Sequence, residues 1–424
     1  MKNLLIFLLM TTTLVSQDKY IHAGKIFDSS SGKYQLNKTI IISDNIISSI
    51  EDGFIEPKNE NISVYDLRSK VILPGLIDFH VHMESESGGK DRYINRFQDN
   101  KADVAFKSTV VAKKTLLAGF TTVRDVGGSG VNISLRNAIN NGVVIGPRIF
   151  TSGKTIATTG GHGDPTNGYK EELVDDPGPE DGVVNSISDA RKAVRYRYKN
   201  GADLIKITAT GGVMSMAKNG QNPQFTEEVM SEIVRTANDY GMHVAAHAHG
   251  DEGMYRAVKS GVKTIEHGSI MKERTMKLMR EKNAYLVPTI SAGEHVAKMA
   301  RIPGYYPEII IPKAIEIGVQ NKASTKRAFQ MGVPIAFGTD AGVYPHGDNA
   351  GEFLYMDEIG IPAEYSIKSA TITNAKLLNM ENMLGQIKKG FYADIIATDK
   401  SPTDDISTLK NVIFVMKNGK VYKN

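Results

Sequence analysis

The clearest indication of the fold is the stretch Leu73-Pro74-Gly75-Leu76-Ile77-Asp78-Phe79-His80-Val81-His82. The apolar residues from Val71 to Phe79 favour a β-strand, and the two histidines stand at i and i+2, so they lie on one face of that strand. Two imidazoles at a strand end can bind one metal ion. The pair alone also fits two hydrogen-bonded core histidines, because a bare His-x-His arises by chance.

Later apolar strand-like runs also end in polar side chains, namely Lys206, His247 with His249, His267, and Asp340. Helical stretches such as 105–117 and 226–240 separate the strand-like runs. A repeated order of strand, polar residue, loop and helix predicts an α/β fold, a (β/α)8 TIM barrel with its chemistry at the C-terminal rim. We expect the eight strands to begin near Val71, Thr121, Arg148, Leu204, His243, Thr264, Tyr285 and Pro334.

Lys206 alternates with Ile205 and Ile207, so its side chain enters the barrel if theirs face the helices. An unpaired ammonium there would be costly, and another group must neutralise it. An ion pair with Asp340 or another carboxylate is one solution.

The motifs PGLIDFHVH, LIKITATGG, AAHAHG, IEHGS and FGTDAG occur in this order. Together they resemble the amidohydrolase superfamily of metal-dependent hydrolases. The branch that the chain resembles includes Xaa-Pro-type and other dipeptidases, imidazolonepropionase-like proteins and the amidases that cleave ochratoxin. The resemblance extends over nearly everything after the N-terminal leader.

The chain has 424 residues, which exceeds a bare barrel of about 250. Short alternating strands and turns occupy both ends, and an Asn418-Gly419 turn fits a hairpin. The resemblance implies that residues 17–70 and 382–424 form one small β-sandwich domain, and that residues 71–381 form the barrel.

The resemblance also implies two divalent metal ions, with zinc as our expectation, since the donors are nitrogen and oxygen. It assigns His80, His82, Lys206 and Asp340 to one ion, and Lys206, His247 and His267 to the other. In this assignment Lys206 carries a carbamate formed with carbon dioxide, and its two oxygens bridge the ions.

For catalysis, the resemblance implies a metal-bridging hydroxide as nucleophile and Asp340 as general base and then acid. His162 follows the third strand in a glycine-rich loop. In relatives the matching histidine reaches the substrate and stabilises charge. A histidine that only stabilises its loop is the alternative.

Five residues are candidates for substrate contact. His249 occupies the position of a substrate-contacting tyrosine in some relatives, although a hydrogen-bonded loop histidine fits equally well. Arg124 ends a strand and could hold a carboxylate, or it could form a structural ion pair with Asp125 or a neighbour. The loop after the eighth strand adds Tyr344, His346 and Asn349.

The net charge of +4 is small, and basic residues are not gathered into a stripe with aromatics, so nucleic-acid binding has no support. An apolar content of 41% with 23% charged residues is ordinary for a soluble globular protein. The expected partner is a small amide or dipeptide, and association of the chain into a homo-oligomer stays open.

Residues 1–16 have the pattern of a secretory signal peptide, with Lys2, an apolar segment from Leu4 to Met10 and a small residue, Ser16, at the expected cleavage site. The chain has no cysteine for lipid attachment or disulfides. We therefore expect a periplasmic or secreted protein without stable membrane association after cleavage.

These patterns predict a hydrolase of the amide bonds of dipeptides or N-acyl amino acids. One alternative is a cyclic-amide hydrolase of the imidazolonepropionase type. Another is a catalytically silent barrel that only binds a ligand, which the complete set of ligand residues argues against. His22, His243 and His295 lack such a context and are assigned no chemistry.

Overall fold

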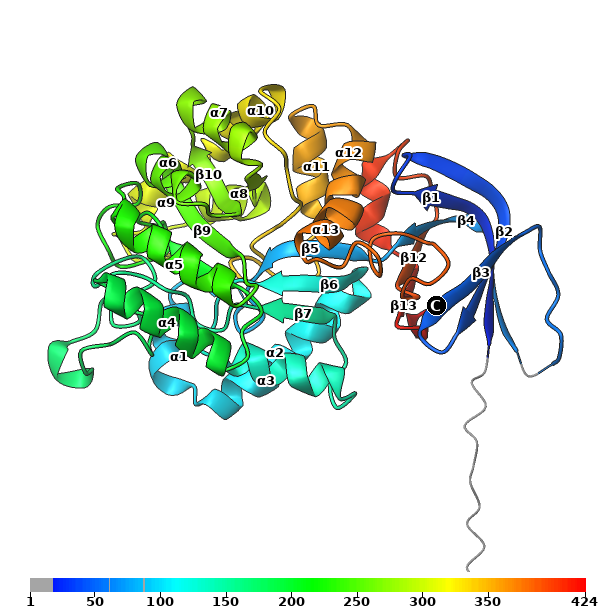
Figure 1. Ribbon diagram of the computed structural model, residues 1–424, viewed down its shortest axis with the longest axis horizontal. Helices are drawn as coiled ribbons and strands as arrows, with labels where there is room; N and C mark the ends of the chain where they lie inside the picture. The colour runs from blue at the N-terminus through cyan, green and yellow to red at the C-terminus, as the bar shows by residue number, and fades with distance from the viewer. Residues whose placement is uncertain (1–17, 61, 87) are drawn as a thin grey trace, which may run out of the picture.

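Parallel strands, each followed by helices, form a barrel in the computed structural model, which describes residues 18–60, 62–86 and 88–424 (Figure 1). The expected signal peptide, residues 1–16, lies outside the described residues. The barrel strands that pair in regular ladders are β5 (Leu76–Val81), β6 (Phe120–Asp125), β7 (Arg148–Thr151), β8 (Ile205–Thr208), β9 (Val244–Gly250), β10 (Thr264–Ile270) and β11 (Tyr285–Val287).

Backbone hydrogen bonds close these strands into a ring. Ile156 joins β7 to β8, because its N–H donates to Lys206 O at 2.8 Å and its carbonyl accepts from Thr208 N at 3.0 Å. Residues 334–341 take the place of the eighth strand, with bridges from Ile335 to β11 and from Ala341 to β5. The chain thus forms the expected (β/α)8 barrel, in which all strand ends surround one centre.

The barrel helices are α1 (Asp91–Gln98), α2 (Lys101–Leu117), α3 (Val131–Asn140), α4 (Ile187–Lys199), α5 (Glu227–Asp239), α6 (Asp251–Lys259), α7 (Glu273–Lys282), α8 (Ile290–Met299), α9 (Ile311–Gly318), α10 (Asn321–Gln330), α11 (Gly351–Glu358), α12 (Ala363–Lys368) and α13 (Asn374–Leu377). Helix α5 illustrates how the sequence favours these helices. Thr226 caps its start by accepting from Val229 N, and Val229, Ile233 and Ala237 recur on its buried face. None of the described helices combines the length and the apolar character needed to cross a membrane.

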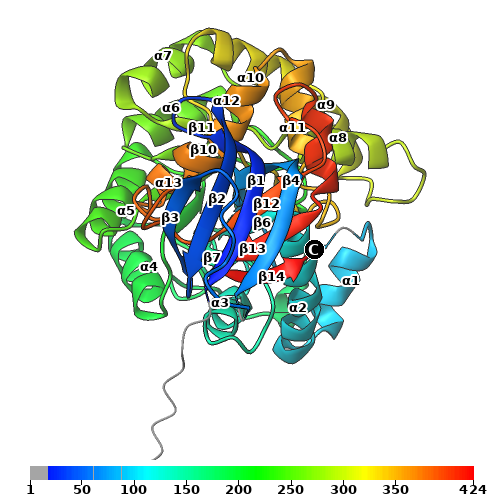
Figure 2. The same cartoon turned by 90° about the vertical axis from the view of Figure 1, so that its right-hand side faces the viewer.

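Strands from both ends of the chain form a separate sheet beside the barrel, which faces the viewer in Figure 2. Its order is β14-β13-β12-β4-β1-β2-β3. The bounds are β1 (Lys19–Asp28), β2 (Lys33–Ser43), β3 (Ile46–Asp52), β4 (Ser63–Pro74), β12 (Ile395–Thr398), β13 (Phe414–Lys417) and β14 (Lys420–Lys423).

This sheet curls on itself, because Ile47 N donates to Phe391 O at 2.9 Å and Ala393 N donates to Asn45 O at 2.8 Å. The start of β3 therefore meets the segment before β12. A core that includes Ile21, Ile72 and Phe414 fills the space between the two halves. This is the β-sandwich, built from both chain ends.

The first barrel strand begins later than the sequence predicts. Residues 71–74 pair with β12 in the sandwich, so β4 ends at Pro74 and β5 begins at Leu76. Gly75 marks the transition, because a Cβ on this residue would lie 2.1 Å from Thr121 Oγ1. The sequence misses the boundary because both strands are apolar and only one residue separates them. The observed starts of β6 to β11 lie within one residue of the predicted ones.

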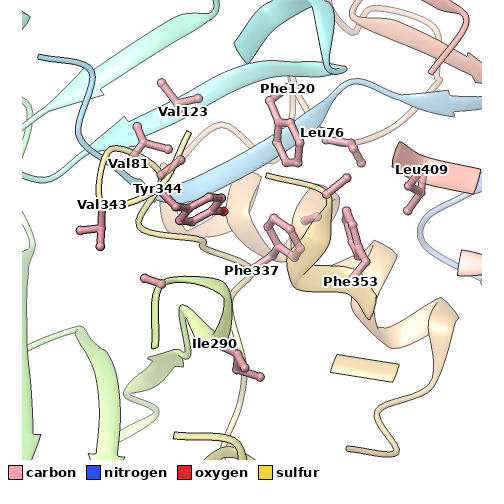
Figure 3. Packing of buried hydrophobic residues seen from close by; sticks show 14 of the residues in the cluster. Leu76, Val81, Phe120, Val123, Ile290, Phe337, Val343, Tyr344, Phe353 and Leu409 are labelled. Carbon is pink, nitrogen blue, oxygen red and sulfur yellow. The ribbon is translucent and has the colours of Figure 1, made fainter. Parts of the chain in front are cut away.

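The largest hydrophobic cluster lies between the first two barrel strands, residues 334–344 and helices α8 and α11 (Figure 3). The ring of Phe337 stacks on those of Phe120 and Phe353, with centroids 5.8 and 4.2 Å apart. Tyr344 also lies in this cluster. The loop that follows the eighth strand therefore folds down onto the core.

Candidate active site

Six side chains that the sequence singles out converge on one cavity of about 920 Å³. They come from the C-terminal ends of different strands, because a closed parallel barrel brings these ends together. The six are His80 and His82 at the end of β5, Lys206 of β8, His247 of β9, His267 of β10 and Asp340 of the eighth strand. His162, after β7, and His249, at the end of β9, line the same cavity.

The carboxylate of Asp340 is the centre of this group. Its Oδ1 lies 3.5 Å from His80 Nε2 and 3.3 Å from His82 Nε2. Donor atoms of His80, His267 and Asp340 all lie within 4.8 Å of one another. The His247 ring centroid is 4.6 Å from that of His267, which extends the group toward β9.

The donor atoms fit divalent metal ions. His80 Nε2 and Asp340 Oδ1 are buried and have no hydrogen-bond partner among the described residues. Unpaired buried polar atoms are costly, and a shared cation would satisfy both. Imidazole nitrogens with a carboxylate are suitable ligands for zinc and for similar ions.

His80, His82 and His267 are each oriented by a contact of the ring nitrogen Nδ1. His80 Nδ1 donates to Glu266 Oε2 at 2.8 Å, and His82 Nδ1 donates to Gly127 O at 2.8 Å. The hydroxyl of Thr289 lies 2.7 Å from His267 Nδ1. These contacts leave Nε2 of each of the three rings available to bind a metal ion. His247 has the opposite orientation, because its Nε2 lies 3.1 Å from Gly211 O.

Backbone strain accompanies this arrangement. His267, Thr289 and Asp340 have φ angles of 74°, 51° and 59°, in the left-handed region that side chains with a Cβ avoid. Residues held in this region cluster where the surrounding structure imposes a function-related geometry. Two of the three are candidate ligands and the third contacts one of them.

Lys206 is buried among these groups, and burial lowers the pKa of its amine to about 8. The acids Glu266 and Asp340 act in the opposite direction and favour the ammonium. Within the described part of the chain, no carboxylate forms an ion pair with Lys206, so the ion-pair alternative is not observed.

His162 packs against His247, with ring centroids 4.3 Å apart and an angle of 27° between the planes. Gly212 permits this position, because a Cβ there would lie 2.3 Å from the His162 ring. Burial lowers the pKa of His162 to about 3, so the ring is neutral near pH 7. His249 is held by Ser269, whose hydroxyl lies 2.9 Å from its Nδ1. Both rings therefore face the cavity from fixed positions.

Arg124 does not reach the cavity, and the expected substrate contact is wrong. Its guanidinium is fully buried, donates to Glu266 Oε1 at 2.7 Å and lies 3.8 Å from the centroid of the Phe79 ring. It also contacts His243 Nε2 at 3.3 Å. The structural ion pair, which the sequence left open, is the observed role, although the partner is Glu266 and not Asp125.

Tyr344, His346 and Asn349 also lie outside the lining of the cavity, so their expected substrate contacts are not observed. Tyr344 packs in the hydrophobic cluster (Figure 3). His346 Nε2 contacts the carbonyls of His82 and Ser85 at 3.2 Å, and Asn349 Nδ2 donates to Asp78 Oδ2 at 2.8 Å. His346 and Asn349 therefore hold the segment that carries His80 and His82, whereas Tyr344 contributes to the core.

Glu266 is the functional residue that sequence reasoning missed. Its side chain is fully buried and connects His80 to Arg124. The guanidinium, His80 and Lys206 keep the pKa of Glu266 well below its usual value, although burial opposes this shift. The sequence could have indicated this role, because Glu266 places a carboxylate in the apolar run before His267, and a charged residue inside a buried strand needs a buried partner.

Comparison with known proteins supports the assignment of this cavity. The amidohydrolase family matches residues 71–422. The ochratoxinase of Aspergillus niger is 32% identical over 439 aligned residues, which cover 98% of this chain and 89% of that protein.

Two solved structures are also similar. A Xaa-Pro dipeptidase with methionine bound in its active site is 51% identical, with a TM-score of 0.92, and covers 96% of this chain and 100% of its own. A prolidase in complex with N-methylphosphonate-L-proline is 31% identical, with a TM-score of 0.87 and the same coverage. The chain therefore belongs to the amidohydrolase family, in the branch of dipeptidases and ochratoxin-cleaving amidases, and is a hydrolase of C–N amide bonds.

Proposed function

We propose that the protein is a binuclear metal-dependent hydrolase that cleaves the amide bonds of dipeptides or N-acyl amino acids. The observation that carries this proposal is the convergence of four histidines, one lysine and one aspartate on a single cavity. Histidines with a purely structural role have no reason to gather in this way around one buried carboxylate, which lies within 3.5 Å of both His80 and His82.

In this proposal His80, His82, Lys206 and Asp340 hold one ion, and Lys206, His247 and His267 hold the other. When bound, the two ions would lower the pKa of a shared water and polarise the scissile carbonyl. Zinc is our expectation for both positions, because the donor set contains nitrogen and oxygen and no thiolate.

A carbamate on Lys206 would supply the bridging oxygens. Its formation joins the neutral amine to carbon dioxide and releases one proton. The buried position of Lys206 supports this step, because burial disfavours the ammonium and no carboxylate of the described residues forms an ion pair with the amine.

Asp340 is the proposed proton carrier. It stands between His80 and His82, so it can accept the proton of the attacking water and return it to the leaving amine. His162 is placed to donate to the oxygen that becomes negative during attack, because its ring is neutral and lines the same cavity.

The substrate class is proposed from the relatives. A Xaa-Pro dipeptidase and a prolidase are dipeptide hydrolases by name, and ochratoxinase is named for ochratoxin. Dipeptides and N-acyl amino acids share one amide bond to an amino acid, so a single cavity can accept both.

The test is a metal analysis combined with a substrate panel. We expect two divalent ions per chain, and hydrolysis of dipeptides or N-acyl amino acids that exceeds hydrolysis of lactams and imidazolones. His82→Asn should lose metal and activity together. His22→Asn is the matched control, because His22 lies in the sandwich strand β1.

Fewer than two ions per active chain would refute the binuclear site. Selective turnover of imidazolones would favour the cyclic-amide alternative instead.

We also propose export of the protein. Expression of the full chain in a bacterial host, followed by N-terminal sequencing of the mature form, should show a start near Gln17. A mature protein that still begins with Met1 would refute the signal peptide.

A further inference from the structure

One wall of the cavity is formed by apolar side chains. We define this apolar wall by Val213 after β8, Ala292 and Val296 of α8, Ile317 of α9 and Val343 after the eighth strand, all of which line the cavity. All five also belong to the largest hydrophobic cluster. The main core of the barrel therefore reaches the cavity at this wall.

The apolar wall begins beside the candidate ligands. Val343 N donates to Asp340 O at 3.1 Å, so the wall starts within one turn of chain from this carboxylate. Thr289, which contacts His267, directly precedes α8. A substrate with its amide bond at Asp340 and His267 therefore brings a neighbouring side chain to this wall.

No described side chain that lines the cavity from α8 or α9 is charged. Two charged groups of these helices, Lys313 and Glu294, are engaged elsewhere. Lys313 Nζ donates to the carbonyls of Ser215 and Ala217 at 2.6 and 2.7 Å, and Glu294 lies 3.3 Å from Lys322. Asn321, at the start of α10, uses its amide to donate to Pro288 O at 2.8 Å.

The side of the cavity formed by α1 and α2 differs in chemistry. Its lining includes charged side chains together with valines, namely Arg92, Asp99, Lys101, Val104, Lys107, Val110 and Val111. The cavity is therefore asymmetric, because this side mixes charged and apolar groups, whereas the described residues of α8 and α9 contribute no charged side chain to the lining.

The packing of α8 holds the apolar wall in place. The carboxylate of Glu352 accepts from Ile290 N at 2.8 Å and from Ser291 N at 2.7 Å, which anchors the start of the helix. Gly293 and Gly318 allow α8 and α9 to approach closely, because a Cβ on Gly318 would lie 2.7 Å from Gly293 O. The wall is thus preorganised and does not need substrate to form.

We propose that the apolar wall is the subsite for an apolar substrate side chain, of the size of leucine, methionine or phenylalanine. This inference rests on the proposed amide hydrolysis and specifies its substrates. Transfer of such a side chain from water to the wall favours binding, whereas an acidic side chain would lose hydration without gaining a partner. The preference for leucine over aspartate should be at least about tenfold in kcat/KM.

The first experiment measures kcat/KM for two dipeptide series, Ala-Xaa and Xaa-Ala, with Xaa as alanine, leucine, methionine, phenylalanine, aspartate or lysine. In one of the two series the apolar residues should be preferred. Val296→Thr keeps the shape of the side chain and adds a hydroxyl, so it should reduce this preference by about tenfold. Ala292→Leu should reduce it most for phenylalanine.

The matched control is Val110→Thr. Val110 lines the same cavity from α2 but lies outside the apolar wall and is exposed. The same substitution there should leave the preference unchanged. A preference that is absent in both series, or that Val296→Thr and Val110→Thr alter equally, would overturn the inference.

A second measurement separates this inference from the proposed hydrolysis. Calorimetry with free L-leucine and L-aspartate on the metal-loaded protein should show tighter binding of leucine, and Val296→Thr should remove the difference. Selective leucine binding without any peptide hydrolysis would support the apolar wall and refute the proposed reaction. Equal binding of the two amino acids would refute the wall.

Discussion

The carboxylate of Glu266 lies 2.8 Å from His80 Nδ1, and neither side chain is exposed to solvent. The second oxygen of this carboxylate accepts from Arg124 Nη2 at 2.7 Å. An arginine in the barrel interior without a negatively charged partner would destabilise the fold, and so would a glutamate without a positively charged partner. The pair satisfies both charges, and it holds the His80 ring with Nε2 toward the cavity.

Glu266→Gln should weaken metal binding by about tenfold to a hundredfold, because the amide is a weaker acceptor for His80 and leaves Arg124 without its counter-charge. Titration of the apoprotein with zinc measures this change. Glu281→Gln on the exposed face of α7 is the control. Unchanged zinc affinity in a folded Glu266→Gln protein would show that this contact does not orient the ligand.

Asp340→Asn should retain at least one ion and lose turnover by about two orders of magnitude or more, because the amide cannot accept the proton of the attacking water. Metal content and kcat, measured on the same preparation, distinguish the two effects. A kcat near that of the unmodified protein would refute the role of Asp340 as the base.

Asp394→Asn should destabilise the junction between sandwich and barrel. Its carboxylate lies 2.7 Å from Arg148 Nη1, and both side chains are mostly buried. Removal of one partner of such a pair costs about 3–5 kcal/mol in the free energy of unfolding. Urea denaturation measures this loss, and Asp399→Asn, which breaks the more exposed pair with Lys70, should cost about 1 kcal/mol or less.

The stability of the fold should decrease in acid partly through His346. Burial lowers the pKa of this imidazole to about 4 from its ordinary value of 6.5. Unfolding exposes a ring that binds a proton more readily, so the stabilisation is present above pH 6.5 and is lost as the pH falls toward 4. His346→Gln should make the free energy of unfolding less dependent on pH in this range, by about 1 kcal/mol per pH unit. Urea denaturation at pH 7, 6, 5 and 4 measures the slope, and equal slopes would contradict the prediction.

The sequence predicts the barrel and the residues of the cavity for a simple reason. Polar residues at strand ends, such as Lys206 and Asp340, interrupt apolar runs at intervals that only a repeated strand and helix unit explains. Closure of the barrel then brings them together whatever the lengths of the loops.

The sequence cannot predict which buried residues contact and orient the candidate metal ligands. Arg124 and Asp340 both stand near strand ends, and only the direction of the side chain separates a core ion pair from a cavity residue. Tyr344 and Asn349 follow the eighth strand, as substrate-binding residues often do, but their loop turns toward the hydrophobic core. Such choices depend on packing between residues that are far apart in the sequence.

The single residue between β4 and β5 leaves no flexible linker where the chain first passes from the sandwich to the barrel. Strand β4 is fixed between β1 and β12 in the sandwich, and β5 carries His80 and His82. Any rotation of the sandwich would therefore pull on the segment that presents these imidazoles. A barrel expressed without its companion would lose the anchor of its first strand, so we regard the two parts as one cooperative unit of folding.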